Sequence, residues 1–406
     1  MGGIYSLSTY NNSLEMHKQC QGKLETVSKV PLNDSHDLSM AYSPGVAEPC
    51  REIYNDPNTV YDYTIKGNLV GVITDGSAVL GLGNIGPEAA IPVMEGKSLL
   101  LKQFAGIDSF PISLNTQDVD EFVATVAAMT PTFGAINLED ISAPRCFEIE
   151  RRLEEMCDIP VFHDDQHGTA IVVLAGLINA LKLVEKPLNG IKVVVNGAGA
   201  AGVAIVHLLH DLGVRNIIVC DSRGIIYEGR QEAMNDTKRE LAQITNEQKV
   251  SGALHDALEE ADVFIGVSVA NLLDESLIRR MAKEPIVFGL ANPDPEILPT
   301  VAKQYGVRVI ATGRSDFPNQ VNNVLAFPGI FRGALDVRAT HINDAMKRAA
   351  VYAIASLISD DDLTEECIIP DPFDERVVPA VAEAVRKAAI ETGVARLTER
   401  QQPVHS

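Results

Sequence analysis

Two acidic pairs follow two short apolar runs near the middle of the chain. Glu139 and Asp140 end the first run, and Asp164 and Asp165 end the second. The segment between the runs mixes apolar and charged side chains in a pattern that predicts a helix. A strand, a helix and a second strand form a parallel unit, and ligands bind where the carboxyl ends of such strands meet. We therefore expect the acidic side chains to converge at one edge of a sheet.

Converging carboxylates repel one another unless a cation lies among them. A set made only of oxygen ligands suits Mg²⁺ or Mn²⁺ better than zinc. The alternative is that the acids are solvated loop residues and that Asp165 caps the helix expected to begin near Gly168. The residues alone leave both interpretations open.

Two other side chains could move protons. Lys97 lies in a helix expected at about 89–104 and has apolar neighbours, and burial lowers the pKa of a lysine toward that of a useful base. The alternative is a lysine whose aliphatic part lies along an amphipathic helix. Tyr42 precedes the turn Pro44-Gly45, which would present its ring at a loop tip. Its alternative role is to pack its ring and form a hydrogen bond through its hydroxyl.

A dinucleotide-binding fingerprint follows the apolar run at 191–195. A helix is expected at 203–212, and Asp221 ends the next strand at 216–220, roughly 20 residues after the last glycine. The glycines allow the backbone to approach a pyrophosphate at the helix N-terminus. Asp221 can accept both ribose hydroxyls and would repel a 2′-phosphate, so NAD is favoured over NADP, although Arg223 could receive that phosphate. The residues of the fingerprint are Gly197, Ala198, Gly199, Ala200, Ala201 and Gly202.

Strands and helices alternate along most of the remaining chain, which predicts a doubly wound parallel sheet. Further strands are expected at 263–267, 286–290 and 307–310. We expect an α/β protein with a smaller N-terminal α/β domain over residues 1–158. A Rossmann-like NAD(P)-binding domain with C-terminal helices would occupy residues 159–406.

Composition limits the partners and the compartment. The chain has 406 residues and a formal net charge of −21, which argues against nucleic acid or an anionic membrane surface as a partner. The six cysteines show no CxxC spacing, and neither a signal peptide nor a long apolar run is evident. We expect reduced thiols and a cytoplasmic protein.

Seven segments occur in one order along the chain. They are AYSPGVAEPC around Tyr42, IPVMEGKSLLLKQFAG around Lys97, NLEDISAP, HDDQHGTA, GAGAAG, ANPDP and NNVLAFPG. Together they resemble the malic enzymes in their compact prokaryote-type form. The resemblance implies oxidative decarboxylation of L-malate to pyruvate and CO₂ with NAD(P)⁺ and Mg²⁺ or Mn²⁺, on a two-domain scaffold that usually forms a homodimer.

The resemblance also implies roles for individual residues. Lys97 resembles the general base, Tyr42 the general acid, and Asp164 the partner of Lys97. The implied metal ligands are Glu139, Asp140 and Asp165. The implied substrate amides are Asn292, Asn322 and Asn323, of which Asn292 also lies at the cofactor; from the residues alone, each could instead close a turn.

One departure and two other functions remain open. Larger malic enzymes hold a substrate carboxylate with an arginine in the turn before LGLG, but here residues 75–79 contain no arginine. A malolactic or oxaloacetate-decarboxylating enzyme could use the same site and would be identified by its products. A non-catalytic sensor that binds a dinucleotide is disfavoured, because it would have no need for the acid–base and metal side chains.

Overall fold

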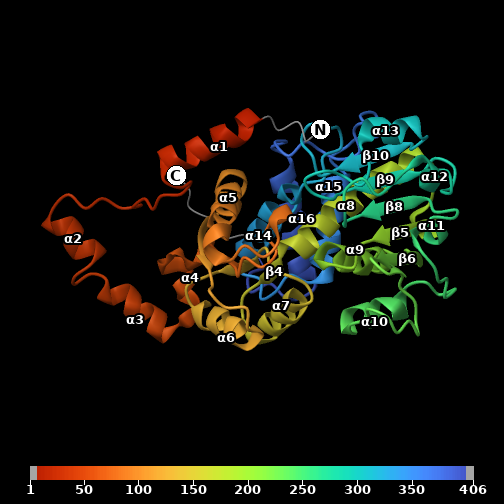
Figure 1. The fold of residues 1–406 in the computed structure, drawn as a ribbon. Coiled ribbons are helices and arrows are strands. Elements are labelled where there is room, and N and C mark those ends of the chain that lie inside the picture. Colours follow the sequence, from red (N-terminus) through yellow and green to blue (C-terminus); the bar gives the residue numbers. More distant parts are fainter. Residues whose placement is uncertain (1–6, 399–406) are drawn as a thin grey trace.

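Two parallel β-sheets organise the chain (Figure 1). The structure is a computed structural model that describes residues 7–398. The first sheet has four strands in the order β2-β1-β3-β4, and the second has six in the order β10-β9-β8-β5-β6-β7. The strands are β1 (Leu69–Thr74), β2 (Asp108–Ser113), β3 (Ala135–Leu138), β4 (Val161–His163), β5 (Lys192–Asn196), β6 (Asn216–Asp221), β7 (Gly224–Ile225), β8 (Val263–Gly266), β9 (Ile286–Gly289) and β10 (Val309–Thr312).

Helices cover both sheets and form the C-terminal part of the described chain. The α-helices are α1 (Leu7–Cys20), α2 (Ser35–Ala41), α3 (Ala47–Asn55), α4 (Val60–Tyr63), α5 (Pro87–Ala105), α6 (Val119–Met129), α7 (Arg145–Met156), α8 (Asp164–Leu183), α9 (Ala200–Asp211), α10 (Asp236–Ile244), α11 (Leu254–Ala257), α12 (Glu275–Ile278), α13 (Pro299–Gln304), α14 (Phe327–Asp336), α15 (Asp344–Ala355) and α16 (Val377–Glu391). Short 3₁₀ turns lie at Pro57–Thr59, Ile65–Asn68, Leu80–Leu82, Leu188–Gly190 and Asn323–Leu325.

The first sheet places the two acidic pairs side by side. All residues of β1 and β3 are buried, as expected of apolar strands covered on both faces. β3 pairs with β4 in parallel, and Leu138 lies opposite His163, the last residue of each strand. The acidic pairs that follow these two residues therefore leave the sheet at the same edge.

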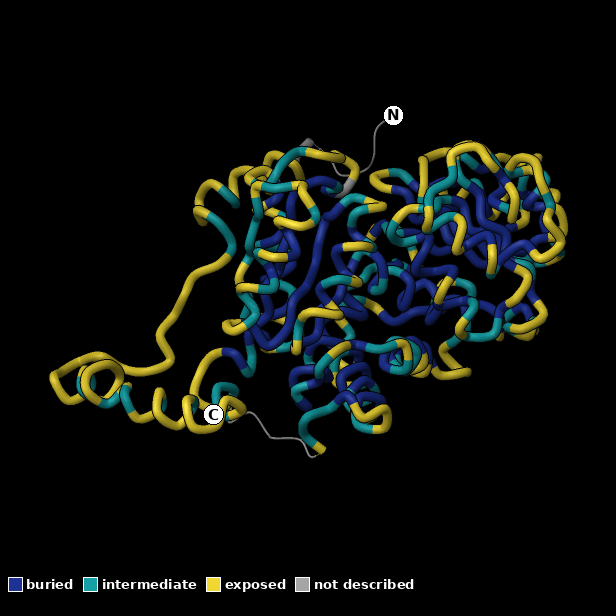
Figure 2. The backbone as a smooth tube through the Cα atoms, turned by 90° about the horizontal axis from the view of Figure 1, so that it is seen from below, coloured by how far each residue is buried: buried dark blue, intermediate teal, exposed yellow. Residues whose placement is uncertain are grey.

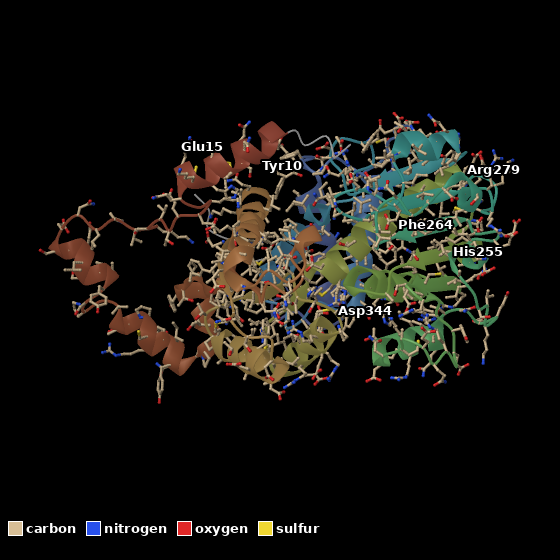
Figure 3. The ribbon with its side chains drawn as sticks, in the orientation of Figure 1. Tyr10, Glu15, His255, Phe264, Arg279 and Asp344 are labelled. Atoms are coloured by element: carbon tan, nitrogen blue, oxygen red, sulfur yellow. The ribbon has the colours of Figure 1, made fainter. Side chains whose placement is uncertain are left out.

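The second sheet confirms the predicted doubly wound fold. β5 lies between β6 and β8 with parallel pairing on both sides, and only β7 among the described strands runs antiparallel. Figure 3 shows Phe264 of β8 inside this sheet, where it is fully buried, with His255 and Arg279 exposed at the rim. The core on this side is rich in β-branched residues, which suits buried parallel strands.

The helix α8 connects the two sheets through the middle of the molecule. By length and composition alone this helix could cross a membrane, but 72% of its apolar stretch is buried inside the protein. It packs against α9 and α15 and belongs to the largest hydrophobic core. We therefore interpret α8 as a core helix whose first turn carries Asp164 and Asp165.

An arm made of α2 and α3 stands away from the rest of the chain (Figures 1 and 2). Neither helix contains a buried residue. Figure 2 shows the arm coloured as exposed or intermediate, in contrast to the buried interior of the rest of the chain. The arm therefore gains almost no packing energy from its own chain.

The structure shifts several predicted boundaries. The strand predicted at 307–310 is β10 at Val309–Thr312, and the helix expected near 168–184 begins earlier, at Asp164. The domain boundary at residue 158 stays a prediction, but β4 pairs with the first sheet. Strand pairing therefore favours a boundary after His163.

Candidate active site

Three carboxylates meet at the edge of the first sheet. Glu139 and Asp140 follow β3, and Asp165 lies in the first turn of α8. One oxygen from each of the three lies within 4.8 Å of the other two. The Asp140 backbone N–H donates to Asp165 Oδ2 at 2.8 Å, which fixes two of these residues against each other. The predicted convergence of the acidic pairs is therefore present in the structure.

The charge at this edge favours a bound cation. Burial raises the pKa of Glu139 and of Asp165, and neighbouring carboxylates raise both further. Burial likewise raises the pKa of Asp164, to about 7. Three carboxylates, those of Asp164, Glu139 and Asp165, act on one ammonium group here. The three oxygens of the candidate metal cluster are all hard ligands at a spacing that a six-coordinate ion can span. These residues fit Mg²⁺ or Mn²⁺.

Lys97 of α5 is the cation in this cluster. Its Nζ lies 2.6 Å from Asp164 Oδ2 and 2.9 Å from Glu139 Oε1, and its side chain is 8% exposed. The ammonium also lies 4.5 Å from the centroid of the Phe327 ring on α14. The structure thus brings together Lys97 and the acid expected to be its partner.

The pKa of Lys97 differs from the lowered value expected from its sequence. Burial acts to lower the pKa of Lys97, but Asp164, Glu139 and Asp165 outweigh that effect, so the pKa lies above its ordinary value. The expected low pKa therefore does not follow from burial. A divalent cation on the same carboxylates would offset their charge, and that is the condition under which Lys97 could act as a base.

One of the three expected substrate amides, Asn323, contacts this cluster. Asn323 Nδ2 donates to Asp164 Oδ2 at 2.5 Å, whereas the side chain of Asn322 accepts from the Val324 backbone N–H and so closes a turn. Asn292 is exposed after β9, and its backbone carbonyl lies against the loop at Gly81. The turn interpretation therefore describes Asn322, and Asn323 belongs to the site.

A buried acid that the sequence did not single out supports the first turn of α8. Glu150 of α7 accepts from the His163 backbone N–H at 2.8 Å, from Gln166 at 2.9 Å, and lies 3.0 Å from His167 Nε2. Burial acts to raise the pKa of Glu150, but its interactions with His167 lower the pKa to about 2. Because His163 precedes Asp164 directly, Glu150 orients the start of α8, which carries Asp164.

A second ion pair, between Arg145 and Asp75, lies at the turn after β1. Arg145, the first residue of α7, donates through NH2 to Asp75 Oδ2 at 2.7 Å and to Ser77 Oγ at 2.9 Å. Its NH1 donates to the backbone carbonyl of Gln117. Sequence analysis found no arginine in the turn at 75–79, and Arg145 brings a guanidinium to that turn from another segment.

Tyr42 is not brought to this site by its own chain. It follows α2 on the arm, and its side chain is 68% exposed. Figure 1 shows α2 well separated from α5, which carries Lys97. The expectation that Tyr42 is presented at an exposed position is met, but the position lies away from the carboxylates.

The dinucleotide fingerprint has the predicted strand–turn–helix context. It joins β5 to α9, whose N-cap is Gly199. A Cβ at Gly202 would lie 1.8 Å from the carbonyl oxygen of Gly197, so only glycine allows this close approach of helix and strand. Asp221 ends β6 beside this turn, as expected.

The surroundings of Asp221 correct the argument for NAD. Arg230 NH2 donates to both carboxylate oxygens, at 2.8 and 2.9 Å, and Lys238 Nζ donates at 2.7 Å. Partial burial acts to raise the pKa of Asp221, but these donors and the Arg223 backbone N–H lower it. Asp221 is therefore an anion whose charge is offset by two cations. Repulsion of a 2′-phosphate is weaker than the sequence suggested.

Comparison with known proteins identifies both halves of the chain. Residues 21–154 match the malic enzyme N-terminal domain, and residues 166–390 match the malic enzyme NAD-binding domain. The bifunctional malic/malolactic enzyme of Bacillus subtilis is 64% identical, with 97% of this chain and 96% of that protein covered. The NAD-dependent malic enzyme of Geobacillus stearothermophilus is 56% identical, covering 97% and 82%.

A solved structure gives the same result for the fold. The malic enzyme from Pyrococcus horikoshii superimposes with a TM-score of 0.93 at 49% identity, covering 96% of this chain and 93% of that one. The two domain matches, the identities and this superposition together span nearly all of the sequence. The chain belongs to the malic enzyme family.

Proposed function

We propose that this protein converts L-malate to pyruvate and CO₂ with reduction of NAD(P)⁺, at the edge of the first sheet. The observation that carries the proposal is the position of Lys97, whose ammonium is paired with Asp164 and Glu139. Glu139 is also one of the three carboxylates that fit a divalent cation. A base next to a metal-binding cluster, facing a dinucleotide-binding domain, suits hydride removal from a 2-hydroxy acid.

The chemistry assigns a step to each group. The amine of Lys97 takes the hydroxyl proton of malate as hydride leaves C2 for the nicotinamide ring, which gives oxaloacetate and NAD(P)H. The C3–C4 bond then breaks, CO₂ leaves from C4, and the bonding electron pair forms an enolate. Mg²⁺ or Mn²⁺ held by Glu139, Asp140 and Asp165 would supply positive charge near the enolate oxygen. Tyr42 donates its phenolic proton to C3 and gives pyruvate.

Tyr42 can take part only if the arm reaches a second copy of the chain. The arm exposes Leu38, Met40, Tyr42, Val46 and Tyr54, and soluble monomers rarely expose apolar side chains so densely. A two-fold dimer exchanges such arms reciprocally, so that each copy covers the arm of the other. We therefore propose a homodimer in which the Tyr42 of one protomer completes the site that contains the Lys97 of its partner.

Complementation tests this arrangement. The Lys97→Ala and Tyr42→Phe chains are each expected to be nearly inactive as homodimers. If the site is shared, co-expressed chains form a mixed dimer in which one site has both wild-type residues, and an equal mixture regains about a quarter of wild-type activity. If both residues act within one chain, every site in the mixture has a defect and no activity returns.

We propose NAD as the preferred cofactor, with NADP also possible. Support for NAD comes from the anionic Asp221 at the end of β6, where a ribose would lie. Support for NADP comes from Arg230 and Lys238, which bring two positive charges to the same position. We further propose a cytoplasmic location, which the free cysteines support.

A malolactic reaction is the second candidate. The Bacillus subtilis relative is named a bifunctional malic/malolactic enzyme, and its identity to this chain is 64%. Incubation of the purified protein with malate, NAD⁺ or NADP⁺, with and without Mn²⁺, separates the candidates. Pyruvate with one equivalent of reduced cofactor supports the main proposal, lactate without net reduction supports the second, and no turnover under any condition refutes both.

A further inference from the structure

The turn after β1 contains a hydroxyl group whose acceptor positions are both filled. Ser77 Oγ accepts from the Ser142 backbone N–H at 2.9 Å and from Arg145 NH2 at 2.9 Å. A serine hydroxyl has two lone pairs and one hydrogen. In the described part of the chain no acceptor receives that hydrogen, although Ser77 is only 6% exposed. The Ser77 hydroxyl is therefore held as a donor.

This donor lies beside the metal-binding carboxylates. The backbone N–H of Ala78, the next residue, donates to the Asp140 carbonyl at 2.9 Å, and the Glu139 N–H donates to Ile73 at the end of β1. Backbone hydrogen bonds thus hold β1 and the turn at 75–79 beside Glu139 and Asp140, which supply two of the three carboxylates. A substrate group bound at those carboxylates would lie close to Ser77.

Arg145 strengthens the donor, and its own hydrogen bonds go to protein acceptors. Its NH2 is bonded to Asp75, whose side chain is completely buried, and its NH1 is bonded to the Gln117 carbonyl. The guanidinium therefore polarises the Ser77 hydroxyl while its own charge is paired. The turn has no cationic side chain of its own, and Lys97 is bonded to Asp164 and Glu139. An anionic substrate needs another donor at this edge.

We propose that the Ser77 hydroxyl, oriented by Arg145 and the Ser142 N–H, donates a hydrogen bond to the C1 carboxylate of malate. This inference rests on the proposed function. C1 is the better candidate of the two carboxylates, because C4 must lose its charge and leave as CO₂, and a strong hydrogen bond to it would oppose that step. C1 remains a carboxylate from malate to pyruvate, so a bond to it stabilises ground state and transition state equally.

Uniform binding of this kind gives a specific kinetic result. Ser77→Ala should raise the KM for malate by about 10- to 100-fold, the loss expected for one hydrogen bond to a charged group, with kcat almost unchanged. Ser77→Thr keeps the hydroxyl and should restore most of the KM. Affinity for NADH should be unaffected in both variants, which shows that they are folded.

Binding of L-lactate to the enzyme with NADH and Mn²⁺, measured by calorimetry, identifies the carboxylate. Lactate shares the C1 carboxylate and the C2 hydroxyl of malate but lacks C4, so Ser77→Ala should weaken lactate by the same factor as malate. Weakening of malate alone, or a wild-type KM in Ser77→Ala, would overturn the inference. A wild-type enzyme that does not convert malate would instead refute the proposed function, whatever the variants do.

Discussion

Replacing Gly168 with alanine tests whether the position of the Asp164 carboxylate controls turnover. Gly168 lies one helical turn after Asp164 in α8, and a Cβ at Gly168 would lie 1.9 Å from Asp164 Oδ1. Real Cβ atoms essentially never approach another heavy atom within 3.0 Å. The carboxylate must therefore move by at least about 1 Å, and Asn323, whose Cβ would lie 3.1 Å away, limits where it can go.

The displacement affects the reacting groups directly. Asp164 Oδ2 lies 2.6 Å from Lys97 Nζ and accepts from Asn323 at 2.5 Å. A misplacement of about 1 Å can lower the rate by about 10²-fold, so we expect kcat for malate to fall by about that factor. The fingerprint on β5 and α9 lies on other segments, so the affinity for NADH, measured by fluorescence, should be kept.

Gly176→Ala is the matched control in the same helix. A Cβ at Gly176 would lie 3.3 Å from Phe288 Cε1 and 3.4 Å from Ile368 Cδ1, contacts that small side-chain movements can relieve. Alanine favours a helix over glycine by about 0.8–1.0 kcal/mol, so this variant should fold well and keep kcat within about twofold. A wild-type kcat in Gly168→Ala, or equal losses in both variants, would show that the Asp164 carboxylate does not set the position of Lys97.

Three further predictions concern the metal, the cofactor and the proton transfers. Asp165→Ala should abolish Mn²⁺-dependent turnover and weaken Mn²⁺ binding in calorimetry while NAD binding persists; an unchanged rate at saturating Mn²⁺ would remove Asp165 from the ligand set. Asp221→Ser should shift the ratio of kcat/KM values toward NADP by roughly 10- to 100-fold, because Arg230 and Lys238 would no longer be paired with a carboxylate and could bind the 2′-phosphate. A wild-type enzyme that already prefers NADP would contradict the proposed preference for NAD. Lys97→Ala should lower the rate of malate oxidation by about 10²- to 10⁴-fold but still decarboxylate added oxaloacetate, which has no hydroxyl proton to lose. Tyr42→Phe should slow protonation of C3, followed in deuterated solvent, by a similar factor. Equal losses in every assay would mean that the two residues have no separate roles.

The sequence predicts the edge of the first sheet because the relevant rules are local. Apolar runs of strand length, each followed by an acidic pair and separated by a helix, can form only a parallel unit of this kind without a long detour of the chain. The register Leu138 opposite His163 then follows from where the runs end. The same reasoning predicts the dinucleotide fingerprint, whose glycines are required by contacts within a few residues.

The side chains that orient the site could not be predicted in the same way. Glu150 and Arg145 lie in α7, a helix rich in charged residues, and nothing local distinguishes a buried acid from its exposed neighbours. Glu150 is buried because α8 begins above it, and Arg145 is paired because the turn after β1 lies beside it. The high pKa of Lys97 has the same origin, since it depends on carboxylates from β3 and α8 and not on the residues that flank Lys97 in α5.

Tyr42 marks the limit of reasoning from a single chain. Its segment predicts a turn with an exposed ring, and the structure contains that turn, yet neither α2 nor α3 buries a residue within the chain. A folded segment gains stability by covering apolar surface, so the exposed Leu38, Met40 and Tyr42 require a surface that one copy does not supply. In the proposed mechanism a second copy has the matching requirement, because the residue assigned as proton donor for C3, Tyr42, lies away from the Lys97 of the same chain. The exposed arm and the proposed role of Tyr42 therefore favour the same contact with a second copy, and activity regained by mixing the Lys97 and Tyr42 variants would show that this contact serves both.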